Sequence, residues 1–227
     1  MIVAISGEKG AGKDTLALIL AQALHVRMYA LAAPVKKAVS ILFKSNDHIE
    51  YYTNDFYDKN ERTYIVTVDM EKVRDYLLEV HGESAALEEV DTFFKECFKD
   101  FVLSFSGYVV TLRLTLRDMF QRFGTDFCQG MLGELCWCEL IPASKNLIIT
   151  DVRFPHEREY IKEKLPSVYF IYVDNPYATP NLDSHPSEQD MRDFVYNSYI
   201  YNTKVSKQYL REQVGDVILE LKRRVNI

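Results

Sequence analysis

The sequence is short of the features that mark membrane, nucleic-acid-binding and disulfide-rich proteins. No apolar run approaches the roughly 20 residues that a helix needs to span a bilayer. The 227 residues carry 33 acidic and only 27 basic side chains, and the net charge of −6 disfavours binding along a nucleic-acid backbone. We therefore predict that neither a membrane nor a nucleic acid is a partner, and that any nucleotide binds in a local basic pocket.

Cysteine and tryptophan are also scarce, with four cysteines and one tryptophan in the chain. The spacing of Cys97, Cys128, Cys136 and Cys138 matches neither a standard zinc motif nor a Cys-x-x-Cys pair. The N-terminus begins as an apolar run suited to a core strand, which is not the pattern of a signal peptide. These features predict reduced thiols in a cytoplasmic protein.

The strongest pattern is a glycine-rich turn, residues 7–15, between a predicted strand at 2–5 and a predicted helix at 16–24. Glycines in such a turn let backbone N–H groups point at phosphate oxygens, and the helix adds its positive N-terminal end. Lys13 would reach the β- and γ-phosphates. The pattern predicts an ATP site formed by Gly10, Ala11, Gly12, Lys13, Asp14 and Thr15. The alternative is a glycine-rich turn of another α/β protein, which Gly7, Gly12 and Lys13 together disfavour.

The residue after the lysine departs from the strict P-loop pattern, which has a serine or threonine there as a magnesium ligand. Asp14 occupies that position, and Thr15 follows one place later. A carboxylate therefore replaces a neutral hydroxyl near the metal. We predict Asp14 as a magnesium ligand, and leave open whether the bond is direct.

A second carboxylate follows another predicted strand, residues 147–150. Asp151 ends this run, at the edge where ligands bind in open parallel sheets, so it can hold magnesium or orient a substrate. Arg153 comes two residues later, and Glu157 lies in the first turn of a helix that Pro155 begins. The alternative is a purely structural ion pair between Asp151 and Arg153.

A predicted helix from Thr115 to the Gly124-Thr125-Asp126 run has a second polar pattern. Arg117, Gln121 and Gly124 recur at helical spacing and could contact a phosphate, a base edge and a flat ring. The alternative places Arg117 and Gln121 on a solvated surface. Trp137, in a further predicted helix at about 130–140, is either a core residue or a stacking platform for a base.

The rest of the chain predicts an α/β architecture with an insertion. Further strands are expected at 26–31, 168–173 and 196–201, a helix from Pro34, and one final helix with an apolar face at 210–221. Residues 45–67 have no clear period and predict an irregular segment. Asp69 and Ser84 are predicted N-caps of two helices, and Gly82 ends the first. We predict that residues 45–110 form a helical insertion acting as a substrate-side or lid subdomain of a single P-loop domain, residues 1–227.

Four motifs together resemble the deoxynucleoside monophosphate kinases of tailed bacteriophages. They are Gly-x-x-Gly-x-Gly-Lys-Asp-Thr at 7–15, Leu-x-x-Arg-x-x-x-Gln-x-x-Gly-Thr-Asp at 114–126, Asp-Val-Arg-Phe-Pro-x-Glu at 151–157 and Asp-Ser-His-x-Ser-Glu at 183–188. The motif order is kept from residue 1 to about 218, and the resemblance thins between 45 and 108. Phosphomevalonate kinases also resemble the P-loop variant with aspartate after the lysine, so the two motifs at 114–126 and 151–157 are the more specific ones.

The resemblance implies a three-layer P-loop fold with a central five-stranded parallel sheet. It implies transfer of the ATP γ-phosphoryl group to a deoxynucleoside 5′-monophosphate, with Mg²⁺, in a possible homodimer, and in the host cytoplasm if the protein is phage-encoded. Lys13, Asp151 and Arg153 would then be catalytic, with Asp14 and Asp151 as magnesium ligands. The monophosphate site implied by the resemblance consists of Arg117, Gln121, Gly124, Thr125, Trp137, Asp151, Arg153 and Glu157.

Two other functions share the P-loop. A small-molecule kinase of the phosphomevalonate type would have a different acceptor pocket. A P-loop ATPase that responds to a protein partner would need an arginine supplied across an interface. The net charge and the Arg117, Gln121 and Trp137 set favour a small acceptor.

The P-loop assignment predicts the effect of Lys13→Ala. Turnover should fall by orders of magnitude because the short, neutral alanine side chain can neither reach nor neutralise the β- and γ-phosphates. The protein should stay folded, since the ammonium is expected to face ligand and not core. Near-normal turnover in a folded variant, checked by circular dichroism, would remove the P-loop from the mechanism.

Overall fold

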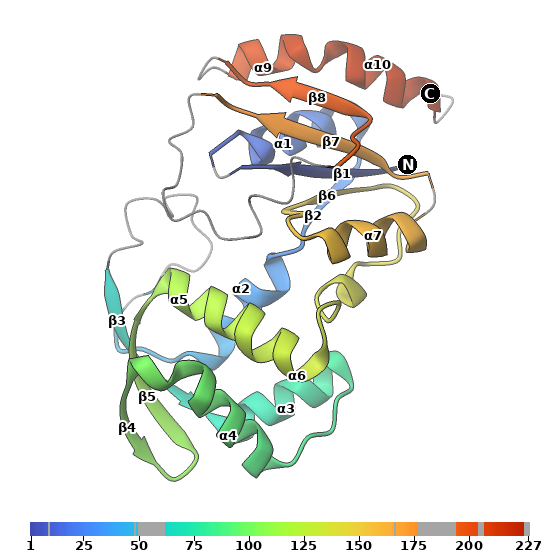
Figure 1. Ribbon diagram of the computed structural model, residues 1–227. Coiled ribbons are helices and arrows are strands. Elements are labelled where there is room, and N and C mark those ends of the chain that lie inside the picture. Colours follow the sequence, from blue (N-terminus) through green and yellow to red (C-terminus); the bar gives the residue numbers. More distant parts are fainter. Residues whose placement is uncertain are drawn as a thin grey trace. The chain divides into compact units, whose positions relative to one another are not determined.

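The computed structural model describes residues 1–8, 10–47, 49, 62–165, 167–176, 194–203 and 207–224. The chain divides into two compact units (Figure 1). Unit 1 comprises Met1–Leu31 with Ile141–Ile227, and unit 2 comprises Ala32–Leu140. The predicted insertion at 45–110 lies inside unit 2, which begins earlier and ends later. Among the described residues, no helix has the length and apolar character that crossing a membrane requires.

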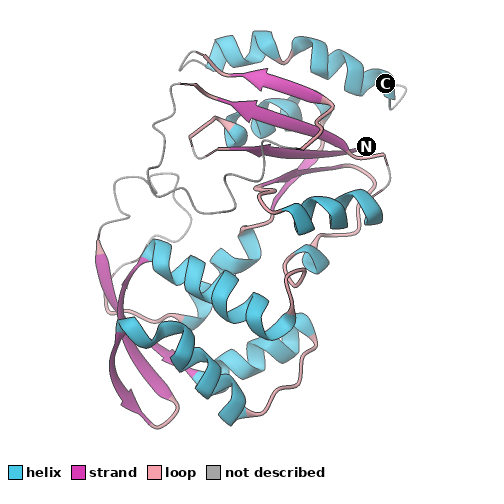
Figure 2. Ribbon diagram, viewed as in Figure 1, coloured by secondary structure: helices cyan, strands magenta, loops and turns pink. Residues whose placement is uncertain are grey.

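Unit 1 is built on a five-stranded parallel sheet with the strand order β2-β6-β1-β7-β8 (Figure 2). Its strands are β1 (Ile2–Gly7), β2 (Arg27–Ala30), β6 (Leu147–Thr150), β7 (Tyr169–Asp174) and β8 (Ser198–Tyr201). The predicted five-stranded parallel sheet is confirmed, and each predicted strand is found within two residues at its ends. Fully buried runs such as that of β6 are typical of parallel sheets covered on both faces.

Helices cover both faces of this sheet, so the unit has three layers. Val3 and Ile5 of β1 pack with α1 (Lys13–Leu24), α9 (Lys207–Gln213) and α10 (Gly215–Arg224). Ile2 and Ala4 point the other way and pack in the cluster that contains Ile161 of α7 (Pro155–Lys164). The prediction of one final helix is wrong in one respect, because a turn at Val214 divides this segment into the two helices α9 and α10.

Unit 2 combines helices with an antiparallel sheet of order β3-β5-β4. The strands are β3 (Thr63–Asp69), β4 (Val102–Ser106) and β5 (Val109–Thr115). The helices are α2 (Ala33–Leu42), α3 (Met70–His81), α4 (Leu87–Phe98), α5 (Leu116–Gln121), the π-helical η2 (Arg122–Gln129) and α6 (Gly130–Leu132), with short 3₁₀ turns η1 (Lys99–Phe101) and η3 (Cys138–Leu140).

The predicted helical insertion is therefore correct for α3 and α4 but missed the sheet. Along β3, exposed and buried residues alternate, with Tyr64, Val66 and Val68 buried. Such alternation is typical of a strand. The prediction missed this strand because most of it was included in the irregular segment 45–67, which is polar before residue 63. The β4–β5 hairpin turns at Gly107, whose φ of 61° lies in the left-handed region.

Several predicted helix boundaries can now be compared with the structure. Asp69 caps α3 by accepting a hydrogen bond from the Glu71 backbone N–H, and Gly82 ends the helix with a φ of 70°. Thr115 and Asp118 form a reciprocal capping box at the start of α5. The prediction for Ser84 is wrong, because α4 begins at Leu87 and Ala86 is its N-cap.

The predicted break at 124–126 is also wrong. The chain continues from α5 through η2 into α6, which ends at Leu132. The single helix expected at about 130–140 is therefore wrong, because this range holds only α6 and the 3₁₀ turn η3, with turns between them. Gly124 is tolerated there because it packs tightly against α2. A Cβ at this position would lie 2.9 Å from Cγ1 of Val35.

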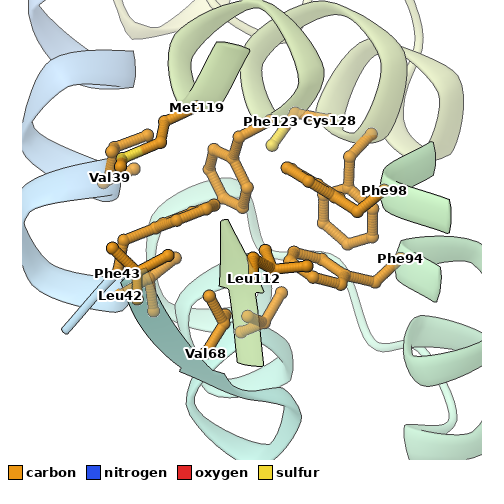
Figure 3. Close-up of a cluster of buried hydrophobic side chains, with 14 of the residues drawn as sticks. Val39, Leu42, Phe43, Val68, Phe94, Phe98, Leu112, Met119, Phe123 and Cys128 are labelled. Carbon is orange, nitrogen blue, oxygen red and sulfur yellow. The ribbon is translucent and has the colours of Figure 1, made fainter. Parts of the chain in front are cut away.

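The core of unit 2 is a cluster of aromatic side chains (Figure 3). The rings of Phe94 and Phe98 stack with centroids 4.3 Å apart, and Phe43 meets Phe123 edge-on at 5.7 Å. Figure 3 shows Cys128 beside these rings, and it is a free thiol like Cys97 and Cys136. These residues come from the C-cap of α2, from α4 and from η2, so the cluster joins segments that precede the small sheet, lie between its strands and follow it in the chain.

The aromatic cluster predicts a large cost for Phe94→Ala. The free energy of unfolding should fall by about 3–5 kcal/mol, since a fully buried ring is replaced by a cavity. Urea unfolding followed by the fluorescence of Trp137, the single tryptophan, reports on unit 2. The matched control is Phe105→Ala, since Phe105 is 54% exposed, and its cost should stay below about 1 kcal/mol. Equal losses in the two variants would contradict the assigned core.

Candidate active site

The P-loop connects β1 to α1 through backbone conformations that favour glycine. Gly7 and Gly12 have φ angles of 148° and 100°. A Cβ at Gly7 would lie 2.3 Å from the carbonyl oxygen of Val173 on the neighbouring strand, so no side chain fits there. No side chain caps the start of α1, which leaves its positive end for an anionic ligand. The predicted strand, turn and helix are confirmed.

Lys13 lies over the loop that precedes it. Its Nζ donates hydrogen bonds of 2.8 Å to the carbonyl oxygens of Gly7 and Glu8. The ammonium is therefore held by the loop itself, at the start of α1. Asp14 follows in the first helical turn and is exposed.

Asp151 lies at the same edge of the sheet as the P-loop. Strands β1 and β6 pair in parallel from Ile2 and Leu147 to Ala4 and Ile149, so their carboxyl ends are neighbours. Asp151 has a φ of 63°, which is uncommon for a residue other than glycine and is typical of functional turns. Arg153 donates to its Oδ1 at 3.5 Å, a long contact, and is 49% exposed. The ion pair named as the alternative is thus present, and it leaves most of the guanidinium free to bind other groups.

Glu157 is buried beneath this turn, with 7% of its surface exposed. Its Oε2 accepts hydrogen bonds from the backbone N–H groups of Arg153, at 2.7 Å, and Phe154, at 3.0 Å. Burial raises the pKa of Glu157 to about 7, and the two N–H donors only partly oppose that effect. Through these two hydrogen bonds, the buried Glu157 side chain holds the backbone that directly follows Asp151 in place.

The predicted acceptor residues of unit 2 lie on α5 and η2. Arg117 and Gln121 are half-buried and one turn apart on α5, and Gly124 and Thr125 follow in η2. Arg117 makes no ion pair or hydrogen bond with any residue in the described part of the chain. By contrast, its neighbour Arg122 is paired with Asp126 at 2.7 Å. A half-buried arginine without such a partner is suited to bind an anion.

Trp137 is a core residue of unit 2, which agrees with the first of its two predicted roles. Only 5% of its surface is exposed, and its ring meets His81 edge-on at 5.1 Å. Its Nε1–H donates a 2.8 Å hydrogen bond to the carbonyl oxygen of Gly124. Trp137 therefore fixes the backbone of η2 next to Thr125. The run at 183–188, with Lys9 of the P-loop, lies outside the described residues.

Two asparagines at this edge escaped the sequence reading. Asn202, directly after β8, donates from Nδ2 to the carbonyl oxygen of Ala11 at 2.9 Å. Asn175, directly after β7, makes a longer contact of 3.5 Å with the carbonyl oxygen of Gly10. Both asparagines directly follow a strand of the parallel sheet. Their position at a strand end could have indicated in the sequence that they lie near the P-loop. Both carbonyls belong to the P-loop.

The chain is similar in sequence to known nucleotide kinases. A protein of Acanthamoeba polyphaga mimivirus, named as a candidate deoxynucleotide monophosphate kinase, is 25% identical over 226 residues, covering 96% of each chain. An unliganded sugar kinase structure from Janibacter sp. HTCC2649 matches with 12% identity and a TM-score of 0.35, over 96% of this chain and 94% of the other. That likeness is too low to carry an argument. The family model described as deoxynucleotide monophosphate kinase matches residues 1–210. The chain therefore belongs to the deoxynucleotide monophosphate kinase family and is a phosphotransferase.

Proposed function

We propose that the protein transfers the γ-phosphoryl group of ATP to the phosphate of a deoxynucleoside 5′-monophosphate, giving the diphosphate and ADP. The main support for this proposal is that the P-loop and the Asp151–Arg153 turn follow adjacent parallel strands and lie at the same edge of the sheet. Family membership supports the acceptor class. Phosphoryl transfer needs alignment and charge neutralisation more than covalent chemistry, and these residues supply both.

On the ATP side, the backbone of residues 10–15 surrounds the phosphates and the start of α1 faces them. Lys13 exchanges its bonds to the Gly7 and Glu8 carbonyls for the β- and γ-phosphate oxygens. Asp14, Thr15 and Asp151 offer the oxygen ligands that Mg²⁺ prefers, so these residues fit the ion that accompanies ATP. When bound, Mg²⁺ would neutralise charge on the β- and γ-phosphates.

Each unit by itself offers groups suited to a nucleotide acceptor. In unit 1, Arg153 keeps its planar fork available for a pair of phosphate oxygens. In unit 2, the guanidinium of Arg117 makes no ion pair or hydrogen bond with the described residues, so it can bind a phosphate. Gln121, one turn on, offers a donor and an acceptor to a base edge. Trp137 contributes by fixing Gly124 and hence the backbone of Thr125. Glu157 contributes by holding the turn that carries Arg153.

The proposal predicts which acceptors stimulate ADP release from ATP–Mg²⁺. Several deoxynucleoside monophosphates should do so, and 5-phosphomevalonate should not, because it has no base for Gln121 to contact. Arg117→Ala should weaken all nucleotides together, since each carries the same phosphate. Gln121→Ala should change the ranking among bases. If no monophosphate raises ADP release above the ATP-only rate, the proposed acceptor class is wrong and a partner-dependent ATPase takes its place.

The buried carboxyl below the Asp151–Arg153 turn predicts a contrast between Glu157→Ala and Glu157→Gln. Both N–H donors use one oxygen, so glutamine can keep both bonds through Oε1, whereas alanine removes them. Turnover should fall at least tenfold in Glu157→Ala and stay within about threefold of the wild type in Glu157→Gln. Steady-state kinetics at saturating ATP measures this difference. Equal losses in both variants would instead show that the carboxylate itself takes part.

The same carboxyl predicts a pH dependence of stability. Its pKa rises from 4.5 to about 7 on folding, so between these values the folded protein binds more protons than the unfolded chain. Glu157 therefore makes the free energy of unfolding fall as pH rises through this window. Urea unfolding from pH 4.5 to 7.5 should show this decline in the wild type, and a smaller one in Glu157→Gln.

A further inference from the structure

The amide of Asn202 connects the last strand of the sheet to the P-loop. Its backbone N–H donates to the carbonyl oxygen of Asp174 at 2.7 Å, which extends the pairing of β8 with β7 by one residue. This bond fixes the Cα position. Its side chain then reaches across to Ala11, whose surface is fully buried. The contact joins residues 191 positions apart in the chain and depends on the strand order of the sheet.

The amide also occupies the space beside Gly12. A Cβ at Gly12 would lie 2.7 Å from Nδ2 of Asn202 and 4.0 Å from Cδ2 of Leu210. The loop is therefore backed by Asn202 on this side. Glycine at position 12 is favoured by its φ of 100°, and any side chain there would displace the Asn202 amide.

The oxygen of the Asn202 amide, unlike its nitrogen, makes no hydrogen bond with the described residues. This atom, Oδ1, is buried. A buried acceptor without a partner costs roughly 1–3 kcal/mol, which a residue placed for stability alone would avoid. The orientation of the amide follows from the donor bond to Ala11, because the flipped amide would set two oxygens against each other.

We propose that Asn202 is a positioning residue that shapes the P-loop for the phosphates of ATP, an inference that rests on the proposed function. The carbonyl of Ala11 and the N–H of Gly12 belong to one trans peptide and point in opposite directions. By binding the carbonyl from outside the loop, Asn202 directs the Gly12 N–H to the inner side, where phosphate oxygens bind. Asn175 contacts the carbonyl oxygen of Gly10 in a similar way, at 3.5 Å, and so supports the orientation of the preceding peptide of the loop.

The experiment compares Asn202→Ala and Asn202→Asp with the matched control Asn197→Ala. Asn197 lies directly before β8, and its Oδ1 accepts a 2.7 Å bond from the Phe170 N–H, at the opposite end of the strand from the P-loop. Each variant loses one side-chain bond between β8 and its surroundings. For each, calorimetry gives the Kd of ATP–Mg²⁺, a thermal melt gives the Tm, and kinetics give the KM of the monophosphate.

Asn202→Ala should raise the Kd of ATP about fivefold to tenfold, with the Tm within about 2 °C of the wild type, because the unpaired Oδ1 leaves together with the bond. Asn202→Asp should raise the Kd further, since its carboxylate faces the Ala11 carbonyl. Asn197→Ala should lower the Tm and leave the Kd unchanged. The KM of the monophosphate should stay constant throughout.

An unchanged Kd in both Asn202 variants overturns the inference, and so does a Tm loss in them as large as in Asn197→Ala. If Asn202→Ala does not fold, Asn202→Asp decides by the same Kd. A wild type that binds ATP but phosphorylates no monophosphate contradicts the proposed acceptor and leaves this test intact. A wild type that does not bind ATP overturns both.

Discussion

The parallel pairing of β1 with β6 on one side and β7 on the other is the constraint on which the candidate site depends. Because all five strands of unit 1 run the same way, every carboxyl end lies at one edge. The P-loop follows β1, Asp151 follows β6, and Asn175 and Asn202 follow β7 and β8. Residues from four separate stretches of sequence thereby meet without any loop having to reach far.

That edge has an unusual backbone, and buried polar groups hold it in place. The backbone of Asp151 is in the left-handed region, which residues other than glycine rarely adopt. Glu157 supports the turn that follows by accepting two backbone N–H groups, at the cost of burying a carboxyl whose pKa is raised. Asn202 supports the P-loop and leaves its own Oδ1 unpaired. Both side chains therefore hold a defined backbone arrangement at this edge and accept a local cost in stability.

Unit 2 follows a different principle, in which aromatic packing determines the position of polar residues. The Phe94 and Phe123 cluster holds α4 and η2 together, and Trp137 ties the Gly124 carbonyl. The tight contact with Val35 explains why position 124 of this continuous helix is a glycine, since it leaves no room for a side chain. On the neighbouring turn, Arg117 makes no ion pair or hydrogen bond with the part of the chain that the structure describes.

The sequence by itself determined the positions of the strands of unit 1, the P-loop and the Asp151–Arg153 turn, because buried strands, glycine turns and strand ends are encoded by neighbouring residues. The parallel five-stranded arrangement was implied by the family resemblance, since the pairing joins distant segments. It also indicated the caps at Asp69 and Thr115 for the same reason. The strands of unit 2, the continuous helix through Gly124 and the burial of Trp137 were decided by contacts between distant segments. The roles of Glu157 and Asn202 belong to this second group, since a carboxyl below a turn and an amide behind a loop are recognised only when the folded chain brings their partners within hydrogen-bond distance.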